Sequence, residues 1–165
     1  MRRTLTHRSA ITAAALALAL ATPSVALAQT QTQPATNTNK AVKVSVTVNG
    51  PDGLLFKGKV RTKGHDVTTA TGGTHPCDGT NGGANPSKVP TPTAALDDAA
   101  RKNGFTWDGA WYASFDDFSV DTIKNVSGGG SAYWNIAVNG TSTPVGGCQF
   151  TIAAGDQVSF TWTSF

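Results

Sequence analysis

The sequence has 165 residues, and its thirteen Lys and Arg outnumber its ten acidic residues, all of which are Asp. Three of the basic residues, Arg2, Arg3 and Arg8, lie in an N-terminal segment with the features of a signal peptide. Without these three, ten basic residues remain against the ten Asp, so the rest of the chain carries no net charge. This balance excludes long-range electrostatic attraction to nucleic acid or to anionic membranes.

The N-terminal segment contains the three parts of a secretory signal peptide. Its basic residues precede an apolar run at 10–21, and the motif ALA at 26–28 matches the small-x-small cleavage pattern. We therefore expect cleavage after Ala28, with Gln29 as the mature N-terminus. The apolar run is too short to span a bilayer as a helix, so no membrane insertion is expected after cleavage. The sequence thus predicts a signal peptide at 1–28 and a secreted, extracellular protein.

The two cysteines, Cys77 and Cys148, form an even pair in a chain that is predicted to be exported. Exported chains commonly use cysteine for disulfides, and a bridge here would close a loop of about seventy residues and stabilise the fold by roughly 4 kcal/mol. The alternative is a zinc site, for which His75 is the only nearby additional ligand. We predict the disulfide, with no metal and no cofactor.

The segment at 29–40 is polar and of low complexity, which predicts a disordered tether before a single domain at 41–165. The domain opens with two predicted strands. Valines alternate with polar residues over 41–48, and a second extended segment follows at 54–62. The turn sequence NGPDG lies between these segments, so they are expected to form a hairpin.

A segment rich in Gly, Pro, Thr and Asn follows at 63–92 and is typical of a long loop. We expect Cys77 to hold this loop against the loop that carries the second cysteine. A helix should come next, because Thr91 is a suitable N-cap and Pro92 suits the first helical position. The pair Asn-Gly at 103–104 should end it.

The last part of the chain alternates aromatic segments with turns. Residues 105–118 concentrate aromatic side chains without a helical or strand period, and 118–124 are expected to form a strand. Two stronger strands, at 133–138 and 157–163, place apolar side chains on one face by alternation. One short helix packed on a mostly antiparallel or mixed sheet makes the expected fold class α+β.

Four segments carry a resemblance to a known family: TAALDDAARKNG, FSVDTIKNV, YWNIAVNG and PVGGCQFTIAAGDQVSFTW. They resemble the domain of unknown function related to the C-terminal part of transcobalamin, which is similar to the soluble-ligand-binding β-grasp group. The resemblance covers residues 42–163 and is most specific from Tyr133 onward. It implies a β-grasp-like fold and a secreted or surface location. The pairing of Cys77 with Cys148 looks like a variant found in exported proteins of actinobacterial type.

In transcobalamin, the region that this sequence resembles forms part of the lid over a corrinoid. The helical domain that supplies most of that binding site is not contained in this sequence, and neither is the cobalt-coordinating residue.

The acidic residues at 97–98, 116–117 and 121 could supply a carboxylate pair for hydrolysis. We interpret them instead as solvated side chains at turns and near the start of the helix. A Ser/His/Asp triad with His65 or His75 would need a nucleophile motif that the sequence lacks. The sequence therefore predicts no enzymatic activity and no catalytic residue.

One segment of the sequence partly resembles a calcium-binding loop. The segment DGTNGG at 78–83 alternates short oxygen ligands with glycine, but Thr80 stands where the calcium-loop pattern needs Asp or Asn. No distal glutamate follows, because the chain contains no Glu. We predict no metal.

Aromatic side chains are the best candidates for a binding surface, because large amphipathic rings give contact area at small entropic cost. Trp107, Trp111 and Tyr112 lie in the irregular segment, so we expect at least one of them to be exposed, although all three could belong to the core. The loop at 144–147 could lie close to a ligand or be only a sharp connection. The predicted ligand-binding residues are Trp107, Trp111, Tyr112, Pro144, Val145, Gly146 and Gly147.

These features favour a secreted, non-enzymatic module that binds a small ligand or a glycan. The alternative is a cell-surface module that binds an envelope protein through a flat patch and has no small-molecule pocket. Nucleic acid is not an expected partner in either case.

Overall fold

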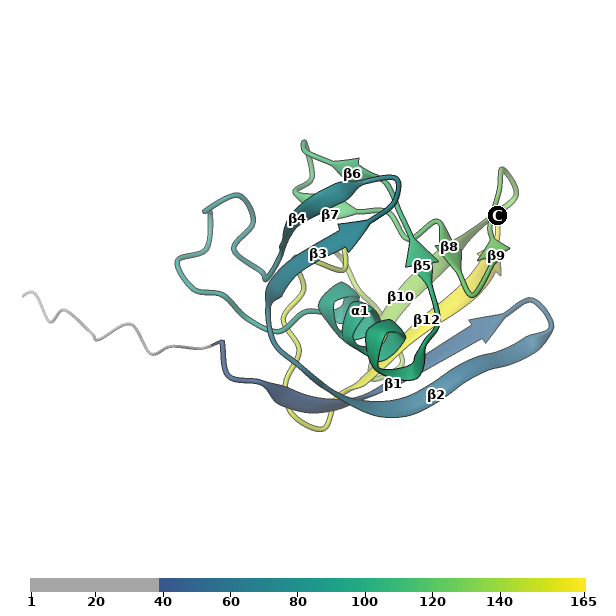
Figure 1. The fold of residues 1–165 in the computed structure, drawn as a ribbon, viewed down its shortest axis with the longest axis horizontal. Helices are drawn as coiled ribbons and strands as arrows, with labels where there is room; N and C mark the ends of the chain where they lie inside the picture. The colour runs from purple at the N-terminus through teal and green to yellow at the C-terminus, as the bar shows by residue number, and fades with distance from the viewer. Residues whose placement is uncertain (1–38) are drawn as a thin grey trace, which may run out of the picture. The chain divides into compact units, whose positions relative to one another are not determined.

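The computed structural model describes residues 39–165 (Figure 1). The predicted signal peptide at 1–28 and most of the predicted tether at 29–40 lie outside the described residues, and the domain start at 41 stays a prediction. The described chain contains one helix, α1 (Pro92–Asn103), and twelve strands, so the expected α+β class is confirmed. The strands are β1 (Val42–Gly50), β2 (Gly53–Thr62), β3 (His65–Thr69), β4 (Gly73–Cys77), β5 (Trp107–Asp108), β6 (Trp111–Tyr112), β7 (Asp117–Phe118), β8 (Thr122–Ile123), β9 (Val126–Ser127), β10 (Ala132–Val138), β11 (Thr141–Ser142) and β12 (Gln157–Ser164).

Five strands form the main sheet, in the order β11, β10, β12, β1, β2. Strand β1 pairs in parallel with β12, whereas the other neighbouring pairs are antiparallel. The sheet is therefore mixed, within the range that the sequence predicts. The first and last strands of the described chain are neighbours at the centre of this sheet, so the two ends of the domain are joined by backbone hydrogen bonds. The more specific β-grasp assignment stays a prediction.

Helix α1 has the ends that the sequence predicts. The side chain of Thr91 accepts a hydrogen bond from the amide of Ala94 at 3.4 Å and caps the N-terminus. Gly104 caps the C-terminus with a left-handed φ of 69°, and its amide donates to the carbonyl of Ala100. Figure 1 shows α1 lying across one face of the main sheet, with the β3–β4 hairpin on its other side.

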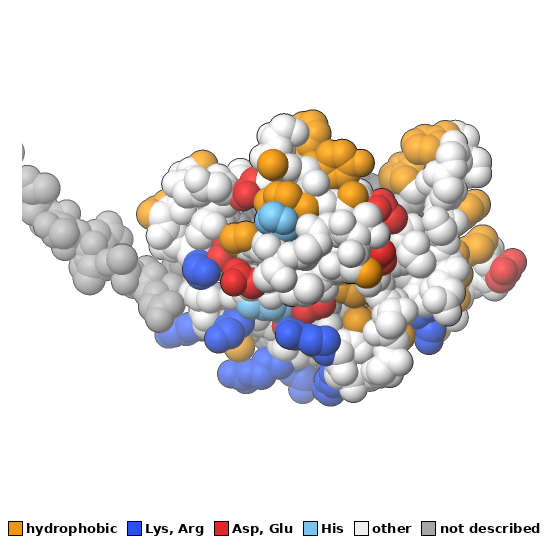
Figure 2. All heavy atoms as spheres, turned by 45° about the horizontal axis from the view of Figure 1, so that its top comes forward, with side chains coloured by type: hydrophobic (Ala, Val, Ile, Leu, Met, Phe, Trp, Pro, Cys, Tyr) orange, Lys and Arg blue, Asp and Glu red, His pale blue; other side chains and the backbone are white. Residues whose placement is uncertain are grey.

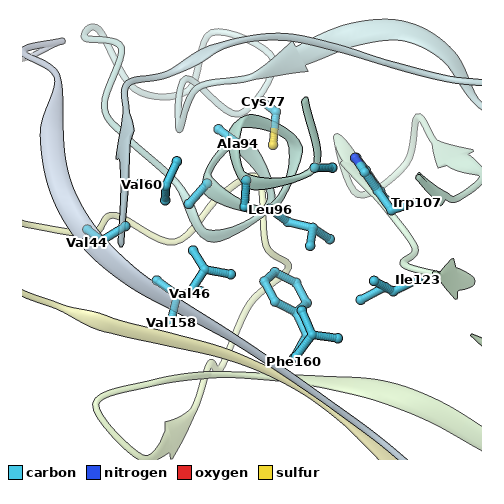
Figure 3. Close-up of a cluster of buried hydrophobic side chains, with 14 of the residues drawn as sticks. Val44, Val46, Val60, Cys77, Ala94, Leu96, Trp107, Ile123, Val158 and Phe160 are labelled. Atoms are coloured by element: carbon cyan, nitrogen blue, oxygen red, sulfur yellow. The ribbon is translucent and has the colours of Figure 1, made fainter. Parts of the chain in front are cut away.

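The core lies between α1 and the main sheet. Val44 and Val46 of β1 and Phe160 of β12 are at most 1% exposed. Figure 3 shows these side chains directed toward Leu96 of α1, with Ile123 beside them. The alternation of valine with polar residues in β1 therefore has the expected cause, since one face of the strand is buried and the other is solvated.

Two sequence predictions about strands are wrong. The segment predicted as a long loop at 63–92 contains the hairpin of β3 and β4, in which Val67 is fully buried opposite His75. The predicted strand at 118–124 is two separate short strands, β7 and β8. Between them, the amides of Ser119 and Asp121 bond to the carbonyls of Ala110 and Asp108. Short strands of this kind depend on tertiary partners more than on local propensity.

Candidate functional site

The aromatic segment contains a tight hairpin that carries two exposed rings. Strands β6 and β7 pair Trp111 with Phe118 and Tyr112 with Asp117. In the turn between them, the amide of Phe115 donates to the carbonyl of Tyr112 at 3.0 Å. Tyr112 is 50% exposed and Phe115 66% exposed, with ring centroids 6.5 Å apart. Two adjacent solvent-exposed rings make this hairpin a candidate binding surface.

The loop at 144–149 and the hairpin enclose a surface depression of about 500 Å³. The side-chain amide of Gln149 donates to the backbone carbonyl of Phe115 and joins the two segments. The lining is apolar at the rim and contains one carboxylate. The lining residues are Tyr112, Phe115, Asp117, Phe118, Ser119, Pro144, Val145, Gly146 and Gln149.

Two glycines allow the loop to approach the rest of the site closely. A Cβ on Gly146 would lie 1.7 Å from Oδ2 of Asp117, and a Cβ on Gly147 would lie 2.1 Å from Oγ1 of Thr93. Neither distance is compatible with a real side chain, so both positions require glycine. Pro144, two residues earlier, restricts the backbone at the entrance of the loop. The loop is thus tightly packed rather than merely connecting.

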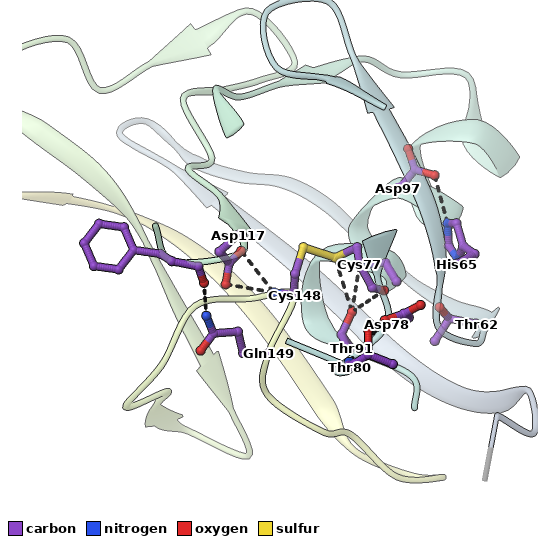
Figure 4. The surroundings of a disulfide bond; sticks show 12 residues. Thr62, His65, Cys77, Asp78, Thr80, Thr91, Asp97, Asp117, Cys148 and Gln149 are labelled. Carbon is purple, nitrogen blue, oxygen red and sulfur yellow. Dashed lines mark hydrogen bonds and ion pairs between the residues drawn. A yellow bond between two sulfur atoms is a disulfide. The ribbon is translucent and has the colours of Figure 1, made fainter. Parts of the chain in front are cut away.

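Asp117 is the buried acid at the base of the depression. Both of its carboxylate oxygens accept from the amide of Cys148, at 3.1 and 3.2 Å (Figure 4). Burial raises the pKa of Asp117 to about 7, although the amides of Cys148 and Phe118 act in the opposite direction. This carboxyl therefore changes its charge near neutral pH, inside a mostly apolar depression.

The predicted disulfide between Cys77 and Cys148 is confirmed and joins the end of β4 to the loop. Two backbone hydrogen bonds of 3.0 Å reinforce this junction. The amide of Gly79 donates to the carbonyl of Cys148, and the amide of Thr93 in α1 donates to the carbonyl of Gly147. The wall of the depression is therefore held by β4 and by the helix at once.

A second depression, also of about 500 Å³, continues from the first. The two share Phe118, Ser119 and Gly146 in their lining. At the far side of the second depression, Tyr133 stacks on Phe165 with ring centroids 5.3 Å apart. Figure 2 shows hydrophobic side chains in two groups at the top of the view, one over β6 and β7 and one toward the C-terminus. We call the two depressions together the groove.

The predicted site residues are only partly brought together. Tyr112, Pro144, Val145 and Gly146 line the first depression, and Gly147 lines the second. The two tryptophans lie elsewhere. Trp107 is buried, and its Nε1 donates to Oδ1 of Asp97 at 3.2 Å. Trp111 is stacked on the imidazole of His75, with centroids 4.3 Å apart, so its ring supports the hairpin from behind.

Five residues that line the first depression were not predicted: Phe115, Asp117, Phe118, Ser119 and Gln149. The sequence contained a signal for Phe115, which belongs to the same aromatic segment as Tyr112. It contained no signal for Asp117, because the neighbouring Asp116 has the same chemistry and only the fold buries one of the two. Gln149 is placed by its hydrogen bond to the hairpin, which is a tertiary contact.

A second polar cluster lies on α1, away from the groove. Nε2 of His65 lies 3.1 Å from Oδ2 of Asp97, and Nδ1 lies 2.8 Å from the carbonyl of Lys63. Arg101 reaches Asp97 at 3.2 Å and Asp98 at 2.5 Å. The interpretation of Asp97 as a solvated acid near the helix start is wrong, since it is buried in the middle of α1.

The surroundings of His65 determine its protonation. Burial alone lowers its pKa, but the hydrogen bonds to Asp97 and to the Lys63 carbonyl and the charge of Asp98 together raise it above 6.5. Both ring nitrogens of His65 have hydrogen-bond partners within the protein. Acid–base sites often contain a histidine close to aspartates. Here the histidine and both aspartates are hydrogen-bonded or ion-paired to other residues of the protein.

The segment at 78–83 offers no arrangement suited to calcium. Asp78 accepts from the hydroxyl of Thr80 at 2.6 Å and pairs with the ammonium of Lys88 at 2.9 Å. Burial opposes ionisation of Asp78, but these two partners lower its pKa below the usual 3.8. Within residues 39–165, no group of three or more His, Cys, Asp or Glu side chains is arranged to hold a metal ion.

No protein-family model and no curated protein sequence matches this chain. Among solved structures, the chain is similar to haptocorrin in complex with Cbi, with a TM-score of 0.51 and 12% sequence identity over 79% of this chain. This chain spans 27% of the length of that protein. The similarity shows that this chain and that protein share a fold. Within the described residues, no helix is long and apolar enough to cross a membrane.

Proposed function

We propose that this protein is a non-enzymatic extracellular binding module whose groove takes a small ligand or a glycan fragment. The observation that carries the proposal is the first depression, in which the exposed rings of Tyr112 and Phe115 face the tightly packed loop at 144–147. Binding sites for small molecules are concave, mostly apolar and supplied with a few fixed polar groups. Asp117 and Ser119 are such groups here.

A glycan fits this combination of side chains. The apolar face of a sugar ring can stack on Tyr112 or Phe115, while its hydroxyls can bond to the carboxyl of Asp117 and the hydroxyl of Ser119. The continuation into the second depression, past Ser127 toward Tyr133, gives room for more than one sugar unit. The structure of haptocorrin with Cbi supports a corrinoid as a second probe, through likeness of fold.

A protein partner is the second candidate, and one observation favours it. Tyr112, Phe115 and Val145 each expose at least 42% of their surface around the rim, and exposed apolar groups of this kind also occur in protein interfaces. In that case the partner would cover the groove instead of entering it.

A fluorescence titration of the purified protein with cell-wall glycan fragments and with cobalamin tests the proposal. Trp134 lines the second depression, and Trp111 lies 4.9 Å from Phe118, so both indoles are suitably placed reporters. We expect saturable quenching by one of these probes. Tyr112→Ala should weaken binding at least about fivefold, because it removes a stacking ring.

Leu54→Ala is the matched control for this titration, since Leu54 is 61% exposed and lies in β2 at the opposite edge of the main sheet. It should leave the titration unchanged. Absence of quenching by every probe would reject the small-ligand proposal. Capture of an envelope protein by the unaltered chain, but not by Tyr112→Ala, would then support the second candidate.

A further inference from the structure

The solvent face of the β1–β2 hairpin carries a row of cations. In β2 the side chains of Lys57, Lys59 and Arg61 alternate with inward-facing residues and are exposed. In β1, Lys43 lies directly opposite Arg61 in the antiparallel register. We call these four residues the basic row. Figure 2 shows Lys and Arg side chains gathered along the lower side of the view, where β1 and β2 lie in Figure 1.

The basic row has no acidic partner in the described part of the chain. All ion pairs among residues 39–165 involve His65, Lys88 or Arg101. Arg61 borders a depression that also contains Asp66 and Asp98, but it forms no ion pair with either. The protein is therefore neutral as a whole beyond its N-terminal segment, yet this face is positive.

Charge repulsion within the basic row also lowers the stability of the fold. Like charges directly opposite one another on two antiparallel strands repel, and Lys43 and Arg61 form such a pair. Lysines on an edge strand can prevent aggregation, which accounts for charge in β2. Edge protection does not account for Lys43, because β1 is an interior strand between β2 and β12. An anion bound along the row would relieve this repulsion.

The spacing of the cations along the strand indicates which kind of anion fits the basic row. Alternate residues of a strand are about 6.8 Å apart, so Lys57, Lys59 and Arg61 place one cation at each such interval along a line. A linear polymer of phosphodiester units repeats its charge over a similar length when extended. Beside the row, β1 and β12 present short polar side chains that can donate hydrogen bonds to phosphate oxygens: Ser45, Thr47, Gln157 and Ser159.

The strand positions directly beside Lys57, Lys59 and Arg61 lack the groups that other polyanions require; the exposed side chains of Leu54 and Tyr133 lie further along the sheet. Single-stranded nucleic acid is bound by aromatic rings on which bases stack, and a membrane surface is bound by apolar side chains that insert between lipids. The side chains that flank the basic row in β1 and β12 are Ser, Thr and Gln. The signal peptide that the sequence predicts and the disulfide Cys77–Cys148 both favour an extracellular partner.

We propose that the basic row binds an extracellular linear phosphodiester polymer of the poly(glycerol phosphate) type and so holds the protein at an anionic cell wall. This surface is formed by β1 and β2, whereas the groove is formed by the β6–β7 hairpin, the loop at 144–149 and β10. Failure of either proposal would therefore leave the other unaffected.

The test measures binding of the purified protein to immobilised poly(glycerol phosphate) at several salt concentrations. Lys59→Gln should weaken binding about fivefold, as expected for the loss of one cation near an anionic surface. Combined replacement of Lys57, Lys59 and Arg61 by Gln should abolish it. Affinity should fall with added salt, and less steeply for the variants. Lys124→Gln, which removes the same charge beside Phe105, is the matched control and should bind normally.

Any of four results would overturn the proposal. One is the absence of salt-dependent binding, and another is an equal loss of affinity in Lys59→Gln and Lys124→Gln. The third is binding of oligo(dT) or of phosphatidylglycerol vesicles as tight as that of poly(glycerol phosphate). If Lys59→Gln changes only the aggregation of the protein, the row serves edge protection alone and the proposal is also overturned.

Discussion

At the scale of single residues, the groove depends on how closely Gly146 approaches Asp117. The Oδ2 atom that a Cβ would meet at 1.7 Å belongs to a buried carboxyl held by the amide of Cys148. That carboxyl cannot move aside without losing its hydrogen bond. Gly146→Ala should therefore lower the free energy of unfolding by about 1 to 3 kcal/mol, as overpacking does, in a urea titration.

Gly130→Ala is the control for this prediction, because a Cβ at Gly130 meets nothing within 4 Å. It should change the free energy of unfolding by less than about 0.5 kcal/mol. Equal stability of the two variants would show that the loop at 144–149 is more adaptable than its packing indicates.

The sequence alone could not have shown that Asp117 is buried in the groove. The sequence presents two adjacent aspartates, and a pattern-based interpretation treats both as solvated. The fold leaves Asp116 half-buried in the turn before β7, with a left-handed φ of 49°, and buries Asp117 against the Cys148 amide. The pKa of about 7 follows from that burial, which is a property of the tertiary structure.

At the scale of elements, the disulfide is the contact that joins the β3–β4 hairpin to the wall of the groove. Replacement of both Cys77 and Cys148 by Ala avoids a lone thiol and should lower the free energy of unfolding by up to roughly 4 kcal/mol. The same variant should bind the groove's ligand more weakly, since β4 no longer holds the loop at 144–149. Urea unfolding in oxidising buffer measures the first effect.

Reduction provides the matching control. Dithiothreitol should bring the stability of the unaltered protein down to that of the double variant and should leave the double variant unchanged. An unaltered protein that keeps its full stability after complete reduction would contradict the prediction.

The elements also show which part of the fold was predictable. The helix ends, the β1–β2 hairpin, β10 and β12 were predicted because caps, turns and alternation are local signals. The β3–β4 hairpin was missed, since its glycines and threonines are typical of a loop and its strands are stabilised by burial of Val67. Four of the seven predicted site residues lie on the loop at 144–147, whose glycines and proline were visible in the sequence.

At the scale of the whole molecule, stability should be greatest in mildly acidic solution. Folding raises the pKa of Asp117 from 3.8 to about 7, so the folded protein holds a proton that the unfolded chain releases. The free energy of unfolding therefore falls as pH rises from about 4 to about 7. The raised pKa of His65 adds stability that is present below 6.5 and is lost as pH rises through its folded value.

Two other acids limit stability at the acidic end. The pKa values of Asp78 and Asp108 are lowered, so their contributions are present above 3.8 and are lost as pH falls through the folded values. Melting temperatures measured across this range should pass through a maximum between about pH 4 and 6. Asp117→Asn, which resembles the protonated acid, should flatten the decline toward pH 7. A melting temperature that rises steadily from pH 5 to 7 would contradict this prediction.

The sequence by itself determined the α+β class, the helix boundaries, the main strands and the disulfide, because each depends on short-range pattern or on the pairing of two cysteines. Only the tertiary structure decided that Trp107 and Trp111 support the fold while Tyr112 and Phe115 face the groove. The reason is physical: burial depends on what packs against a side chain, and those partners lie far away along the chain.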